Sequence, residues 1–167
     1  NHGATGRGDK PDWFKFTWSS PDVGRYFVAQ GWQVVFPQRR GRGASGGLYD
    51  EGFEPDRSRY ACSAQYAQPG LERALADLDA VMAHLRQQPD VDQQRLLLGG
   101  VSRGGVLSVV YSGQRPELFQ GVLNFVGGWV GDACPDAVRV NGWAFQRGAA
   151  FKKPMLWLYG EADPYYT

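Results

Sequence analysis

The chain has 167 residues, 43% hydrophobic and 21% charged, a composition typical of a folded domain and not of a disordered chain. Its 18 lysines and arginines against 17 aspartates and glutamates leave a net charge of +1, so no basic surplus exists for nucleic acid or an anionic membrane. No apolar run approaches the roughly 20 residues of a membrane span. We therefore expect one domain that binds neither nucleic acid nor membrane.

The first predicted helix follows Ser20, with Pro21 at its first position and Gly31 after its end. Residues 33–36 are a short apolar run that predicts a buried strand, and the leucine spacing over 71–87 predicts a longer helix. Further strands are expected at 95–99, 122–126 and 155–159, and further helices over 106–113 and between 136 and 149. Apolar strands alternating with amphipathic helices predict an α/β protein with a parallel sheet covered on both faces.

The motif Gly100-x-Ser102-x-Gly104 lies between a predicted strand and a predicted helix. In such a turn the serine hydroxyl projects from the sheet edge, and glycines on either side avoid collisions. Gly105 would let the helix pack closely against its strand, and the helix amino terminus would aim the Arg103 amide at an oxyanion. We predict that Ser102 is a nucleophile; the alternative is a serine in an ordinary structural turn.

Two other short motifs would complete a serine-hydrolase site. His2-Gly3 resembles the turn that supplies a second oxyanion donor, here the amide of Ala4, although it is also compatible with an ordinary loop histidine. Asp163 follows the last apolar run and is the candidate for the acid that orients an imidazole; the alternative is an Asp-Pro turn. Its rivals among nearby acidic residues are Glu161, Asp132 and Asp136.

Together these motifs resemble the α/β-hydrolase fold, and within it the dienelactone-hydrolase-like and prolyl-oligopeptidase-like members. The doubled glycine after Ser102 and the segments 37–45 and 115–119 are similar to that branch, although Gln38 stands where an aspartate is common. The resemblance implies a serine hydrolase that acts on a small-molecule ester or lactone through an acyl-enzyme on Ser102, with no cofactor and no metal.

Three alternatives to this function remain open. An acyltransferase or a serine peptidase would use the same triad, and a hydrolase-fold binding protein would lack the histidine of the triad altogether. The sequence does not decide between them, and it leaves the oligomeric state open as well.

The family requires a histidine base after the acid, and the chain has none there, since only His2 and His84 occur. His84 is expected on the solvent side of its helix. The strand that precedes the His-Gly turn in this fold, and that lies in the sheet between the strands expected at 33–36 and 95–99, is also missing. We therefore expect residues 1–167 to be a single partial domain, truncated at both ends, of a protein of roughly 250–350 residues. By itself this piece is expected to fold poorly and to lack esterase activity.

The two cysteines, Cys62 and Cys134, are either unpaired thiols or one disulfide. They lie in the segments 48–70 and 129–150, which we expect to cap the strand ends. A bridge would place the protein in an oxidising setting, periplasmic or secreted, and free thiols would fit the cytoplasm.

Several other patterns favour structural roles. The glycines at 41, 43 and 46 imitate a dinucleotide fingerprint, but no helix start and no distant acid follow them. Residues 3–10 lack the ending of a phosphate-binding loop. Three loop arginines are interpreted as solvated and not as an anion clamp, namely Arg39, Arg40 and Arg42. Six loop aromatics would either line an acyl pocket or pack beneath the loops: Trp13, Phe14, Phe16, Trp18, Trp129 and Trp143.

Overall fold

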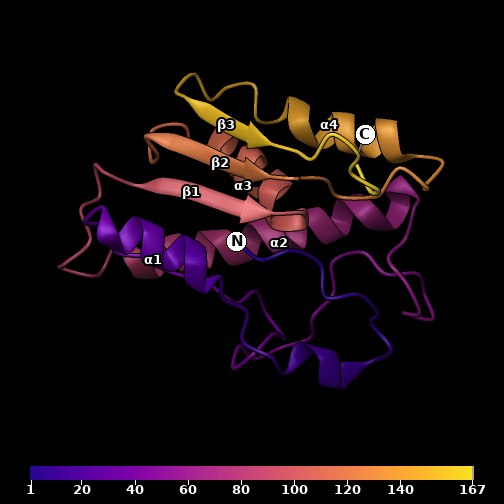
Figure 1. Ribbon diagram of the computed structural model, residues 1–167. Helices are drawn as coiled ribbons and strands as arrows, with labels where there is room; N and C mark the ends of the chain where they lie inside the picture. The colour runs from indigo at the N-terminus through magenta and orange to yellow at the C-terminus, as the bar shows by residue number, and fades with distance from the viewer. Residues whose placement is uncertain (167) are drawn as a thin grey trace.

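Three parallel strands form the centre of the molecule, whose computed structural model describes residues 1–166. The strands pair in the order β1-β2-β3, and all three arrowheads point the same way in Figure 1. Along the chain the elements are the 3-10 helix η1 (Pro11–Phe14), α1 (Pro21–Ala29), α2 (Ala64–Leu85), β1 (Leu97–Val101), α3 (Arg103–Gln114), β2 (Gly121–Phe125), α4 (Ala137–Gln146) and β3 (Met155–Leu158). The predicted α/β class and the strands β1 to β3 are confirmed.

Helix α3 is the most deeply buried element. It packs on β1 and β2, and it contacts α2 and α4 as well. Val106, Leu107 and Val110 are fully buried in it. Leu71 and Leu78 of α2 enter the same core. Each such side chain contributes about 1.5–3 kcal/mol when it leaves water. The helix that follows Ser102 is therefore held by the main core of the domain.

Helix α2 begins seven residues earlier than the start at residue 71 that the leucine pattern predicts. Pro69 lies inside it, near its amino end, where its missing N–H removes one intrahelical hydrogen bond. Ala64 and Ala67 face the core, and small alanines do not stand out in a pattern of large apolar residues. The last seven residues of the segment 48–70, which was expected to cap the strand ends, therefore belong to α2.

The strand predicted at residues 33–36 is wrong, because these residues form no regular secondary structure and pair with no neighbour in the described chain. A groove of about 580 Å³ separates them from β1, lined by apolar side chains such as Phe36, Met82 and Leu98. Asn1, which also lines the groove, bonds through its backbone to Gly99 and Val101 on the outer edge of β1. A strand needs a hydrogen-bonded neighbour, and the groove lies where the neighbour of residues 33–36 would be.

A second, smaller core lies beneath the amino-terminal loops. It contains Phe14, Tyr49 and Phe53, with Tyr60 stacked on Phe53 at 4.3 Å between ring centroids. The aromatics considered as one acyl pocket do not gather: Trp13 and Phe16 are exposed, Phe14 lies in this second core, Trp18 packs against Phe36, and Trp129 and Trp143 belong to the main core. The interpretation as one pocket is therefore wrong.

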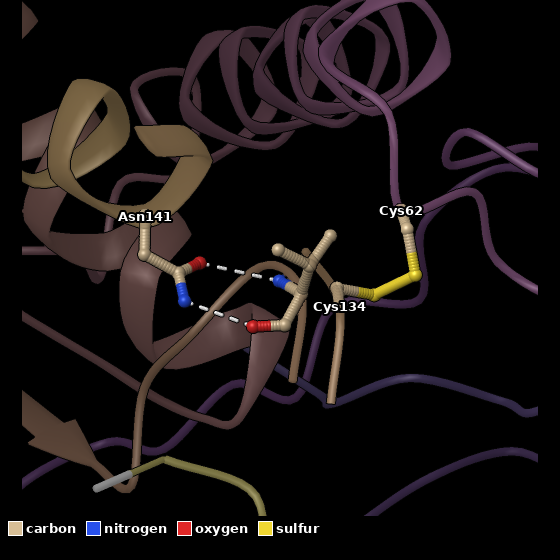
Figure 2. The surroundings of a disulfide bond; sticks show 4 residues. Cys62, Cys134 and Asn141 are labelled. Atoms are coloured by element: carbon tan, nitrogen blue, oxygen red, sulfur yellow. Dashed lines mark hydrogen bonds between the residues drawn. A yellow bond between two sulfur atoms is a disulfide. The ribbon is translucent and has the colours of Figure 1, made fainter. Parts of the chain in front are cut away.

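Cys62 and Cys134 form a disulfide that joins the loop before α2 to the loop before α4 (Figure 2). The alternative of two unpaired thiols is therefore wrong. Beside the bridge, Asn141 of α4 holds both backbone groups of Val130 through its side-chain amide. Two segments 72 residues apart in sequence are in this way tied together.

None of the helices in residues 1–166 combines the length and the apolar character that crossing a bilayer requires.

Candidate active site

Ser102 occupies the sharp turn between β1 and α3. Its backbone has φ of 53° and ψ of −123°, a left-handed conformation that is uncommon for any residue other than glycine. The Ser102 amide donates to the Phe125 carbonyl at 2.9 Å, so the end of β2 holds the turn in place. The side chain is only partly buried. A strained turn of this kind directs the hydroxyl away from the sheet and toward a ligand.

The predicted glycines are placed where the turn leaves no room for a side chain. A Cβ atom at Gly100 would lie 2.1 Å from the Gly104 carbonyl oxygen, and one at Gly104 would lie 2.5 Å from the His2 oxygen. At Gly105 it would lie 2.3 Å from the Asn124 side chain on β2. The three glycines thus allow the turn, the amino-terminal segment and β2 to approach one another closely.

The segment His2-Gly3-Ala4 lies against this turn. A Cβ atom at Gly3 would lie 3.2 Å from the Cβ of Ser102 and 3.7 Å from its hydroxyl oxygen. Ala4 is exposed, and neither its amide nor that of Arg103 donates to another carbonyl among residues 1–166. The Arg103 amide at the Ser102 turn and the Ala4 amide beside it therefore lack a backbone acceptor in the described chain.

His2 is a buried, neutral histidine. Its Nδ1–H donates to the Gly3 carbonyl at 2.8 Å, and its Nε2 accepts from the Arg39 amide at 3.2 Å. Burial, reinforced by the positive charge of Arg39, lowers the pKa of the imidazole to about 2. A general base needs a pKa near the working pH and a free nitrogen. His2 has neither, and His84 is exposed on α2. Among the described residues, no histidine is therefore placed to act as the general base.

Asp163 lies in the turn after β3, and its carboxylate oxygen Oδ1 accepts from the amides of Tyr165 and Tyr166, both at 2.8 Å. The phenol of Tyr166 reaches back to Ser102, with 3.2 Å between the two hydroxyl oxygens, and also donates to the Gly128 carbonyl at 3.1 Å. Burial raises the pKa of the Tyr166 phenol, which therefore stays protonated. In the described chain the connection from Asp163 to Ser102 runs through Tyr166.

The interpretation of the loop arginines as solvated is wrong for Arg39 and Arg42. The side chain of Arg39 is 2% exposed and is bonded to the equally buried carboxylate of Glu51. Arg42 is buried too and donates to the Thr5 hydroxyl. Arg40 is half-exposed and pairs with Asp77 of α2. A guanidinium is buried only at high cost unless it is paired, and the acid that pairs Arg39 is twelve residues away in the loop.

Sequence reasoning missed two residues of this site, Glu51 and Tyr166. Glu51 stands in a glycine-rich loop without a motif, and its only sequence signal is the cluster of arginines that would need an acid once buried. Tyr166 follows Asp163 by three residues, and its only sequence signal is the tendency of an aspartate to form a turn with the residues that follow it. Within the part of the chain that the structure describes, no cluster of His, Cys, Asp or Glu could hold a metal ion.

A parallel sheet, a strained serine between a strand and a buried helix, and free amides beside that serine define an α/β-hydrolase fold. Residues 17–131 match the family model Hydrolase_4, described as serine aminopeptidase, S33. The chain belongs to this family of α/β-type hydrolases. No curated protein matches the chain.

Proposed function

We propose that the protein is a serine hydrolase of carboxylic esters or lactones that works through an acyl-enzyme on Ser102. The observation that carries the proposal is the left-handed Ser102 turn with Gly3 packed against it. This arrangement suits a carbonyl that is attacked by a hydroxyl while its oxygen gains negative charge.

In the proposed reaction the Ser102 oxygen attacks the carbonyl carbon, and the amides of Ala4 and Arg103 bind the oxygen that becomes negative. Collapse of the tetrahedral intermediate expels the alcohol, and water then hydrolyses the acyl-enzyme. The proton taken from Ser102 passes to a histidine that Asp163 orients and returns to the leaving alcohol. The resemblance to the hydrolase family implies that this histidine follows Asp163 in chain order.

The disulfide supports a proposal on the cellular setting. Disulfides persist in oxidising compartments and are rare in the cytosol. Because Cys62 and Cys134 are bridged, we propose that the protein works in the periplasm or outside the cell.

A fluorophosphonate probe tests the nucleophile. With the protein expressed from its complete reading frame, we expect one phosphonyl group, located by peptide mass spectrometry on Ser102, because such probes react with activated serines. The Ser102→Ala variant should remain unlabelled. A label on another serine, or equal labelling of the variant, would refute the proposal.

Peptide hydrolysis is the second candidate, and the family description as a serine aminopeptidase favours it. The same nucleophile and the same two amides would serve an amide substrate. Faster hydrolysis of an aminoacyl p-nitroanilide than of p-nitrophenyl esters and lactones would move the assignment to a peptidase, whereas the ester preference that we expect would support a carboxylesterase.

A further inference from the structure

A buried ionic cluster lies directly beneath the candidate site. Its centre is Glu51, whose side chain is 4% exposed and faces the guanidinium groups of Arg39 and Arg103, each 2% exposed. Arg39 binds both carboxylate oxygens, while Arg103 donates to the Glu51 backbone carbonyl and lies 3.9 Å from the carboxylate. One carboxylate therefore balances two cations that have almost no access to water.

Arg39 connects this cluster to the Ala4 amide, the first of the two candidate hydrogen-bond donors to the oxyanion. Its guanidinium donates to the carbonyl of His2 at 2.9 Å and to that of Gly3 at 3.3 Å. The Gly3 carbonyl belongs to the same trans peptide unit as the Ala4 amide. In a trans peptide the C=O and N–H point in opposite directions. Holding the carbonyl at Arg39 therefore fixes the direction in which the Ala4 N–H points.

Arg103 connects the cluster to the second candidate donor, which is its own backbone amide. Its guanidinium is held between the rings of Tyr60 and Trp129, 3.6 Å and 4.3 Å from the ring centroids. Tyr60 also accepts a hydrogen bond from the Thr5 amide at 3.0 Å, so this ring contacts the amino-terminal segment as well. Anchoring the side chain at the first residue of α3 limits rotation of the backbone that carries the second donor.

We propose that Glu51 is the positioning residue of the oxyanion hole, holding Arg39 and Arg103 so that the amides of Ala4 and Arg103 converge on the substrate oxygen. This inference rests on the proposed function of Ser102. It goes beyond it because Glu51 touches neither the nucleophile nor any predicted triad member. Preorganised donors of this kind act on the transition state more than on the bound substrate.

Glu51→Gln in the protein from the complete reading frame is the main test. The variant keeps the size of the side chain, but it removes the charge that holds two cations and replaces one of the two accepting oxygens by an amide donor. We expect kcat for a p-nitrophenyl ester to fall between about ten- and a hundredfold, with KM within about threefold. The affinity for an alkylboronic acid, whose adduct with serine is tetrahedral and negative, should fall by a similar factor.

Two further variants separate positioning from folding. Asp77→Asn is the matched control, because Asp77 is also a largely buried carboxylate and binds the amide and guanidinium of Arg40 in the same loop; we expect its kcat to stay within about twofold. Arg39→Lys retains the charge pair with Glu51 but loses the planar guanidinium, whose separate N–H groups donate to the carbonyls of His2 and Gly3 at the same time. Its kcat should fall by about tenfold, and this variant decides the matter if Glu51→Gln does not fold.

The outcomes distinguish the two proposals. Hydrolysis that survives Ser102→Ala would overturn the proposed function and this inference with it. Hydrolysis that depends on Ser102, while Glu51→Gln or a folded Arg39→Lys matches Asp77→Asn, would overturn this inference alone. A loss of kcat and of boronate affinity in both variants, with KM and the Asp77→Asn control unchanged, is the result that we expect.

Discussion

Replacing Ser102 by alanine should lower kcat/KM for ester hydrolysis by about 10⁴- to 10⁶-fold, because the acyl-enzyme cannot form without the hydroxyl. The fold should persist, since the Ser102 side chain is only partly buried and its hydrogen-bond partner within residues 1–166 is the Tyr166 phenol. The measurement is steady-state hydrolysis of a p-nitrophenyl ester by the protein from its complete reading frame.

Ser112→Ala is the control for this loss. Ser112 lies in α3, the helix that follows Ser102, is fully buried, and donates its hydroxyl to the Val109 carbonyl at 2.8 Å, away from the turn at Ser102. We expect kcat/KM within about twofold of the unaltered protein, because a hydrogen bond of this kind contributes only about 1 kcal/mol to stability. Equal losses in the two variants would indicate a folding effect and contradict the nucleophile assignment.

Reduction of the Cys62–Cys134 bridge should cause the largest loss of stability. The bridge closes a loop over a sequence separation of 72 residues, for which chain entropy gives a stabilisation of about 4 kcal/mol. At about 2–4 °C per kcal/mol, the midpoint of thermal unfolding should fall by about 8–16 °C when a reductant is added. The measurement is thermal unfolding followed by circular dichroism, with and without reductant.

The double variant Cys62→Ala/Cys134→Ala supplies the comparison. It should unfold at the temperature of the reduced protein and should not respond to the reductant. In the unfolded state, reduction should raise the thiol count of the unaltered protein by two and leave that of the double variant unchanged. A thiol count of the unaltered protein that is the same before and after reduction, or a midpoint of thermal unfolding that the reductant leaves unchanged, would show that the bridge is absent in solution.

Local patterns predicted the elements that position Ser102. The apolar runs that became β1, β2 and β3 and the helix after the serine follow from residues close together in sequence. The strand expected at residues 33–36 failed for the opposite reason. Its hydrogen bonds depend on a neighbouring strand, and a groove occupies that place.

The environment of the site was much harder to predict. Burial of Arg39 depends on Glu51, which belongs to another part of the loop, and the position of Tyr166 depends on where the turn after β3 lies relative to β1. No spacing rule connects these residues, because only the tertiary fold brings them together. His2 shows the same limit: its sequence context indicates a turn, but only its bonds to Gly3 and Arg39 show that it is neutral and fully engaged.

A crystal structure of the phosphonylated protein would examine the nucleophile and its two amides at once. We expect phosphorus bonded to the Ser102 oxygen, with one phosphonyl oxygen within about 3 Å of the amide nitrogens of both Ala4 and Arg103. A phosphonyl oxygen that turns to the Tyr166 phenol or to solvent, with neither amide within hydrogen-bonding distance, would contradict the proposed oxyanion hole.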